Sequence, residues 1–149
     1  MLLSELGFAL RLGIWLCWLP ILLRLRPLPV LLSRHSLAPR RFERRSTQEM
    51  ERAVRIAVRL SALWVFRLPL FPRACLRRSL ALHRVLTRMG YPVEIHFGIR
   101  KEGDVLQGHS WVTIHGKPIA ERAQTEAFKL VYSYPRTPYE LRDKQVLGK

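Results

Sequence analysis

A helix is predicted to begin near the middle of the chain, within the run Phe71-Pro72-Arg73-Ala74-Cys75-Leu76-Arg77-Arg78-Ser79-Leu80. Pro72 suits the first turn of a helix, and Gly90 suits its C-terminal exit. Between them an inward stripe recurs at spacings of four and three residues: Cys75, Ser79, Leu82, Leu86 and Met89. Three basic residues are expected to point elsewhere: Arg77, Arg84 and Arg88. Cys75 is therefore expected to face the body of the protein from the first turn of this helix.

After Gly90 the sequence alternates with a period of two, which is typical of a strand. The apolar positions of this first strand are Val93, Ile95, Phe97 and Ile99. A turn at 101–104 leads to a second strand over about 107–114, a third begins within 118–121, and 128–134 supplies a fourth. Helices followed by an antiparallel sheet indicate the α+β class.

The first half of the chain reads as helices. The first covers about 4–19 and is expected to end at Pro20, and a short one covers 28–34. A capping box at 46–49 opens a third helix, which runs to about residue 66, because serine and glutamate at these positions satisfy each other's backbone amides.

The chain has 149 residues, which is enough for one globular domain with a core. We expect a helical region over 1–67 to pack on a core over 68–134, with a C-terminal tail over 135–149. The two cysteines lie in unlike contexts, so a disulfide framework is not expected and a reducing cytoplasm is the simpler inference. Cys17 lies among Trp and Leu residues within the first helix and is expected to be a core residue.

Three side chains form a candidate catalytic group: Cys75 as nucleophile, His109 as base and Glu121 as the group that orients the imidazole. A helix N-terminus favours the thiolate, which is the reactive form of cysteine. The alternatives are that Cys75 is a small core residue and that His109 is a polar residue at a strand start. Metal binding by these three residues is a further alternative, but they lack the closely spaced pairs of ligands that are typical of metal-binding motifs. No cofactor is expected.

The turn after Ile114 decides whether Glu121 can lie on the same side of the sheet as His109. If only His115 and Gly116 form the turn, Glu121 pairs opposite Ser110 and faces away from His109. A three-residue turn makes Glu121 a diagonal neighbour of His109 instead. The triad thus requires an odd-length turn or a bulge.

Positive charge is concentrated in the first part of the chain. Residues 1–90 contain 17 arginines and four glutamates, whereas residues 91–149 contain nine basic and seven acidic side chains. This distribution indicates either an anion-attracting helical half, suited to an acidic peptide, nucleic acid or lipid headgroups, or arginines on solvated helix faces.

The apolar segment 6–23 is interrupted by Arg11, which leaves an uninterrupted apolar run over 12–23. This run is shorter than the roughly 20 residues that a membrane span needs. We expect a buried helix or one that grazes a membrane, with a signal peptide as the alternative. The expected location is the cytoplasm, with peripheral membrane contact left open.

Several motifs together resemble the transglutaminase-like cysteine-protease domain of lasso-peptide maturation protein B, in its bacterial stand-alone leader-peptidase form. They lie at 72–80, at 91–93 with 97–99, at 108–112 and at 116–119. The resemblance implies a papain-like core in which the Cys-bearing helix packs on a small antiparallel sheet. It matches Cys75 to the family nucleophile and His109 to the general base. Glu121 falls where the family usually has aspartate, and Ser110 replaces the commoner alanine.

The resemblance also implies a function and partners. The enzyme would remove the leader from a ribosomally made precursor peptide, and a separate ATP-dependent macrolactam synthetase would close the ring. Residues 1–70 show no pattern of strands and turns, so the small β-rich leader-recognition domain of fused members is not expected here. A separate recognition protein should then deliver the leader.

Two rival functions remain open at this point. One is a transglutaminase-like acyl transferase that uses the same three residues on an amine acceptor. The other is a non-catalytic basic protein that binds nucleic acid or anionic membrane, although the resemblance gives no reason to expect nucleic acid.

Overall fold

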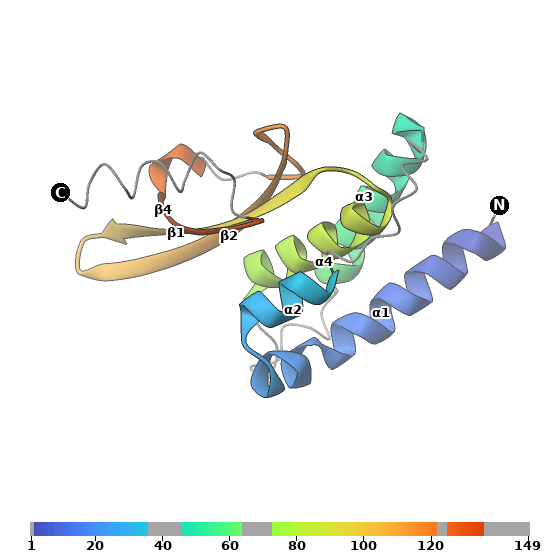
Figure 1. Ribbon diagram of the computed structural model, residues 1–149, viewed down its shortest axis with the longest axis horizontal. Helices are drawn as coiled ribbons and strands as arrows, with labels where there is room; N and C mark the ends of the chain where they lie inside the picture. The colour runs from blue at the N-terminus through green and yellow to red at the C-terminus, as the bar shows by residue number, and fades with distance from the viewer. Residues whose placement is uncertain (1, 36–45, 64–72, 122–124, 136–149) are drawn as a thin grey trace.

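A computed structural model describes residues 2–35, 46–63, 73–121 and 125–135 (Figure 1). The helices are α1 (Leu2–Leu25), α2 (Leu28–His35), α3 (Thr47–Ser61) and α4 (Ala74–Arg88). The strands are β1 (Val93–Glu102), β2 (Val105–Ile114), β3 (Lys117–Pro118) and β4 (Lys129–Tyr134), and a 3-10 turn, η2, covers Thr125–Ala127. The predicted α+β class is confirmed.

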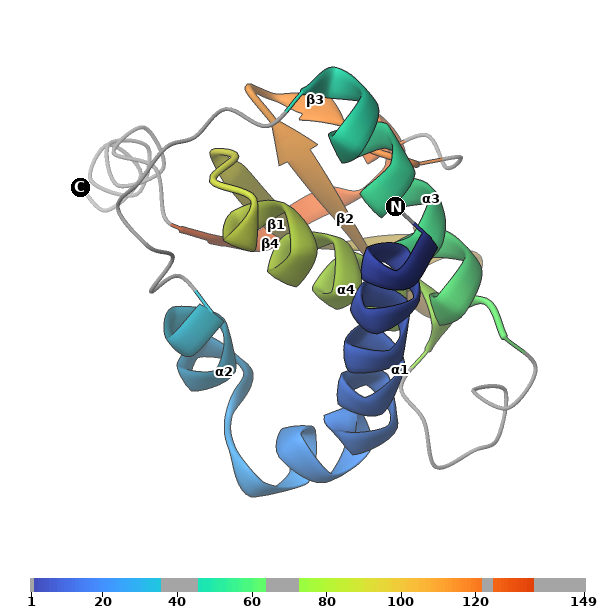
Figure 2. The same ribbon diagram turned by 90° about the vertical axis from the view of Figure 1, so that its right-hand side faces the viewer.

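The four strands form one antiparallel sheet in the order β3-β2-β1-β4. Helix α4 packs against β1 and β2, and α1 lies on the side of α4 away from the sheet (Figures 1 and 2). One core cluster joins the helices to the sheet, and its fully buried members include Leu16, Leu32, Leu86 and Ile95. The N-terminal helices therefore share a core with the Cys-bearing helix.

The predicted inward stripe of α4 is confirmed. Ser79, Leu82, Leu86 and Met89 are buried, and Cys75 is half-buried. Arg77 lies outside this stripe, as expected, but it does not face solvent. It is buried, and its Nε donates a 2.8 Å hydrogen bond to the carbonyl oxygen of Ser61, the last residue of α3. The last carbonyl groups of a helix have no hydrogen-bond donor within that helix. Arg77 of α4 provides a donor for one such carbonyl of α3.

Two predictions about α1 are wrong. Pro20 does not end the helix but lies inside it, because buried residues before Pro20 and partly buried residues after it continue the same packing face. Cys17 is exposed rather than in the core. It lies on the side of α1 opposite Leu12, Leu16 and Leu19, which are buried.

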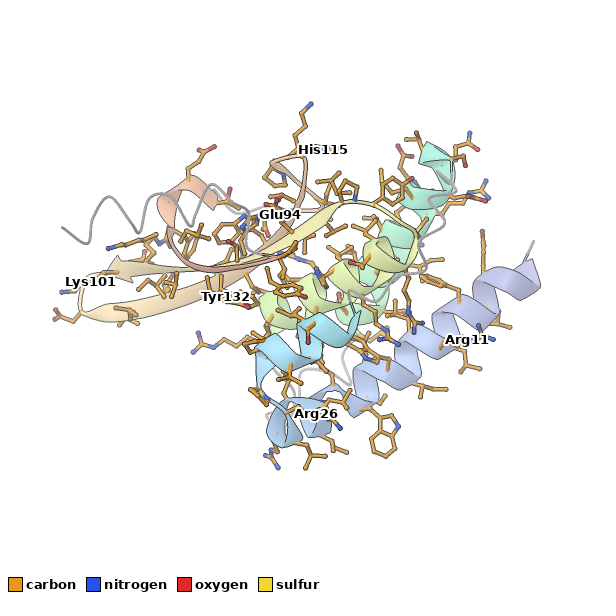
Figure 3. The ribbon with its side chains drawn as sticks, in the orientation of Figure 1. Arg11, Arg26, Glu94, Lys101, His115 and Tyr132 are labelled. Carbon is orange, nitrogen blue, oxygen red and sulfur yellow. The ribbon has the colours of Figure 1, made fainter. Side chains whose placement is uncertain are left out.

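The long hairpin of β1 and β2 turns at Gly103-Asp104, as expected, and Lys101 lies near its far end (Figure 3). Ser46 caps α3 by accepting a 3.3 Å hydrogen bond from the backbone amide of Glu49. Helix α3 ends at Ser61, five residues before the predicted end near residue 66, and Ala62 forms its C-cap. Pro72 lies outside the described residues.

Candidate active site

The first turn of α4 lies beside an open stretch of β2. Strand β3 pairs with only the last two residues of β2, Thr113 and Ile114. Near Ser110, β2 is instead joined to α4, because the Ser79 hydroxyl donates a 2.8 Å hydrogen bond to the carbonyl oxygen of Ser110, and both residues are buried. This bond sets the Cys-bearing helix against the strand that carries His109.

Cys75 and His109 line the same cleft, which has a volume of about 430 Å³. The rest of its lining is mainly apolar side chains and strand backbone: Leu28, Arg73, Leu76, Phe97, Gly98, Ile99, Gly108, Ser110 and Val131. The cleft brings the thiol of α4 and the imidazole of β2 to one surface.

Glu121 lies next to His109. The distance from His109 Nε2 to Glu121 Oε2 is 3.2 Å, and only 4% of the Glu121 side chain is exposed. The two atoms are close enough for an ion pair when the imidazole is protonated, but Nε2 makes no hydrogen bond with the described residues. With Nε2 facing the carboxylate, the second ring nitrogen, Nδ1, is the one left for the thiol.

The hairpin reaches this arrangement by neither of the two routes that the sequence allowed. Its turn holds only His115 and Gly116, both with positive φ (50° and 75°), and His115 lies at the tip (Figure 3). The odd-length turn is therefore wrong. The ladder continues to Ile119, whose amide donates to the Val112 carbonyl oxygen, and then ends at Ala120, which has a φ of 52°. This left-handed residue interrupts the strand alternation and lets Glu121 face His109.

Arg78 is a site residue that the sequence reasoning missed. Its Nη2 donates to both oxygens of Glu121, at 3.1 Å and 3.0 Å. The signal was present in the sequence, because a residue three positions after Cys75 shares its side of a helix. Arg78 balances the charge of a nearly buried carboxylate and holds it beside the imidazole.

Aromatic rings enclose the other faces of His109. The Trp111 ring stacks at 6.0 Å between centroids, and the Phe128 ring lies at 5.0 Å. Gly98 makes room for them, since a Cβ there would lie 2.9 Å from Phe128 Cβ and 3.0 Å from the Trp111 ring. The rings limit the access of water to the imidazole. His96 stacks on Trp111 as well, and its Nε2 is hydrogen-bonded to the Thr113 hydroxyl.

Charge near Cys75 is positive. Burial lowers the pKa of Arg77, and its electrostatic interaction with the nearby Cys75 acts on that pKa in the opposite direction. The side chain of Arg73, at the N-cap of α4, makes no capping bond, and the first-turn amides of a helix carry partial positive charge. These groups can stabilise a thiolate or a developing oxyanion.

Within the described ranges, no three His, Cys, Asp or Glu side chains gather in a way that could hold a metal ion. Cys17 and Cys75 are both free.

No curated protein and no solved structure gave a significant match to this chain. A family model described as transglutaminase-like superfamily matches residues 15–133, from within α1 to the penultimate residue of β4. This match spans the helix with Cys75, the strand with His109 and the segment with Glu121. The superfamily includes cysteine peptidases and acyltransferases. The chain belongs to the transglutaminase-like superfamily.

Proposed function

We propose that this protein is a cysteine peptidase that removes the leader from a ribosomally synthesised lasso-peptide precursor. The observation that carries the proposal is that Cys75 and His109 line one cleft while Glu121 lies 3.2 Å from the imidazole. The motifs around these residues resemble those of lasso-peptide maturation protein B, which supports the finer assignment.

In the proposed mechanism, His109 accepts the proton of the Cys75 thiol, and the thiolate attacks the carbonyl carbon of the scissile amide. The oxyanion of the tetrahedral intermediate accepts a hydrogen bond from the backbone amide of Cys75. His109 then gives its proton to the departing amine, which is the new N-terminus of the core peptide. Water, activated by the same imidazole, hydrolyses the thioester and releases the leader.

Glu121 and Arg78 support the histidine in this scheme. The carboxylate stabilises the imidazolium that forms beside the thiolate and fixes the ring orientation. Arg78 keeps the carboxylate in place. Glutamate is one methylene longer than aspartate, and the left-handed Ala120 sets the backbone from which it reaches His109.

The partners follow from the same proposal. In the described part of the chain, the elements before the Cys-bearing helix are all α-helices, with no small β-rich domain among them. In the stand-alone form that the motifs resemble, a separate leader-recognition protein would deliver the precursor, and an ATP-dependent macrolactam synthetase would use the freed core amine. The proposed location of these steps is the cytoplasm.

The test is to incubate this protein with the precursor and the recognition protein encoded beside it, and to analyse the products by mass spectrometry. We expect a leader and a core peptide whose summed mass exceeds that of the precursor by one water. Cys75→Ala and His109→Ala should each abolish cleavage. Cys17→Ala is the matched control and should cleave normally, because Cys17 is an exposed thiol outside the cleft.

Other outcomes would overturn the proposal. Joining of an amine acceptor to the peptide without gain of water would assign acyl transfer. Full cleavage by Cys75→Ala would remove the thiol from the mechanism.

A further inference from the structure

The outer side of α1 carries a continuous stripe of exposed apolar side chains. Between 45% and 73% of each remains exposed. The stripe consists of Leu6, Leu10, Ile14, Trp18, Ile21 and Leu25. Successive members are three or four residues apart, so they lie on one side of the helix, along about 28 Å of its length. We call this surface the α1 stripe.

Arginines border the α1 stripe. At 3.6 residues per turn, Arg11 falls at one edge and Arg24 at the other, and both are exposed. Arg11 and Arg26, which follows α1, both lie on the side of the molecule away from the sheet (Figure 3). The acidic residue of α1, Glu5, lies off the stripe and pairs with Arg52 of α3 at 3.7 Å. The stripe therefore combines apolar side chains with positive charge alone.

The opposite side of α1 belongs to the protein core. Leu16 and Leu19 are completely buried, and Leu12 and Trp15 nearly so. Although its uninterrupted apolar run is too short for a membrane span, the whole segment Glu5–Leu25, with Arg11 included, is long and apolar enough to cross a membrane. A spanning helix would have to leave this core. While the fold persists, α1 can present only its outer side to lipid. The helix would then lie in the plane of a membrane surface.

We propose that the α1 stripe docks this protein on an anionic lipid bilayer, with α1 parallel to the membrane plane. Apolar residues and Trp18 would enter the boundary between headgroups and acyl chains, and Arg11 and Arg24 would extend to the phosphates. Charge complementarity selects this occupant. Two copies apposed through the stripe would bring bordering arginines of like charge together, whereas anionic headgroups neutralise them.

Vesicle co-sedimentation of the whole protein tests the proposal, independently of any peptidase activity. We expect strong binding to phosphatidylglycerol-containing vesicles, weak binding to pure phosphatidylcholine, and a loss of binding as salt increases. The double variant Leu10→Gln/Ile14→Gln should lower the partition coefficient at least tenfold, because two apolar insertions are lost. Arg11→Gln/Arg24→Gln should lower it about tenfold or more on the anionic vesicles.

The matched control is Leu106→Gln, which replaces an equally exposed leucine in the β1–β2 hairpin, far from α1. It should bind vesicles like the wild type. All these side chains are exposed, so urea unfolding should show the same midpoint for each variant and separate lost binding from lost folding.

Three results would overturn the proposal. The first is equal binding to both kinds of vesicle. The second is unchanged binding by Leu10→Gln/Ile14→Gln. The third is no vesicle binding together with a dimer in sedimentation equilibrium that this double variant dissociates, which would assign the stripe to a second copy.

Discussion

At the scale of single residues, the candidate site depends on how a charge is held out of water. Glu121 is almost fully buried, yet it contacts Arg78 through both oxygens and His109 through one. A buried carboxylate without such partners would be strongly disfavoured. The three side chains thus form one unit. Arg78 offsets the cost of burying the charged Glu121 carboxylate, and the carboxylate orients the imidazole of His109.

Replacement of Arg78 by glutamine should therefore affect stability and activity together. We expect Arg78→Gln to lower the free energy of unfolding by about 1.5–3 kcal/mol, since it removes hydrogen bonds to a buried charge. Urea unfolding measures this loss. Glu102→Gln is the control: its pair with Arg100 is exposed and should contribute less than about 1 kcal/mol. Equal effects of the two variants would show that Glu121 is solvated.

Gly98 should not tolerate a side chain. In Gly98→Ala the new Cβ would press on Trp111 and Phe128, the two rings around His109. Overpacking of this kind costs about 1–3 kcal/mol, and thermal unfolding should report it. Gly108→Ala, on the neighbouring strand, is the matched control because nothing lies within 4 Å of its Cβ position. A neutral Gly98→Ala would mean that the rings have room to move.

At the scale of elements, the position of α4 against β2 sets the distance between thiol and imidazole. Each of the two residues belongs to a different element, and 34 positions separate them in the chain. The bond from the Ser79 hydroxyl to the Ser110 carbonyl is a polar connection between these elements, and Ser110 lines the cleft.

Ser79→Ala should weaken this connection. We expect a loss of about 0.5–1.5 kcal/mol in unfolding free energy and a larger fractional loss of cleavage rate, because small displacements of reacting groups reduce rates strongly. Ser61→Ala is the control, since the hydroxyl of this buried serine donates to the Val58 carbonyl within its own helix, and the Ser61 carbonyl that accepts from Arg77 is kept in the variant. If both variants lower the rate equally, the Ser79 bond does not position α4.

His83 makes α4 sensitive to acid. Burial lowers the pKa of His83 from 6.5 to about 4, so the folded protein keeps the imidazole neutral while the unfolded chain protonates it. Stability contributed by this difference is complete above pH 6.5 and is lost as the pH falls towards 4. When the pH is lowered from 7 to 5, the free energy of unfolding should fall by about 2 kcal/mol more in the wild type than in His83→Leu, and urea unfolding measures this difference. An identical loss in both proteins would show that the folded state protonates His83.

At the scale of the whole molecule, the N-terminal helices and the catalytic elements share one core. Leu16 and Leu19 of α1, Leu32 of α2 and Leu86 of α4 are all completely buried within the same cluster. A truncation at residue 68 would expose this cluster, so we expect it to unfold the site rather than to isolate it.

Two leucines of α1 test this shared core. Leu16→Ala should lower the unfolding free energy by about 2–5 kcal/mol, because it leaves a cavity in the core. Leu10→Ala, on the exposed side of the same helix, should change it by less than about 0.5 kcal/mol. Leu16→Ala should also lose its activity at a lower temperature than Leu10→Ala does. A small effect of Leu16→Ala would show that α1 is dispensable to the domain.

Local sequence was sufficient for the type and order of the elements and for the face that α4 buries. The stripe of α4 and the alternation of β1 depend on backbone periodicity, which nearby residues control. The same is true of the cap at Ser46. Cys75 and His109 could also be named from the sequence, because a helix start and a strand start are local features.

Other features of the structure depend on packing between distant parts of the chain. Pro20 stays within α1, Cys17 faces outward and Arg77 is buried because neighbouring elements, not adjacent residues, provide their surroundings. The approach of Glu121 to His109 depends on the left-handed conformation of Ala120, which an alanine adopts only when the surrounding structure compensates for its strain. Such compensation comes from contacts between distant parts of the chain, and periodicity carries no information about them.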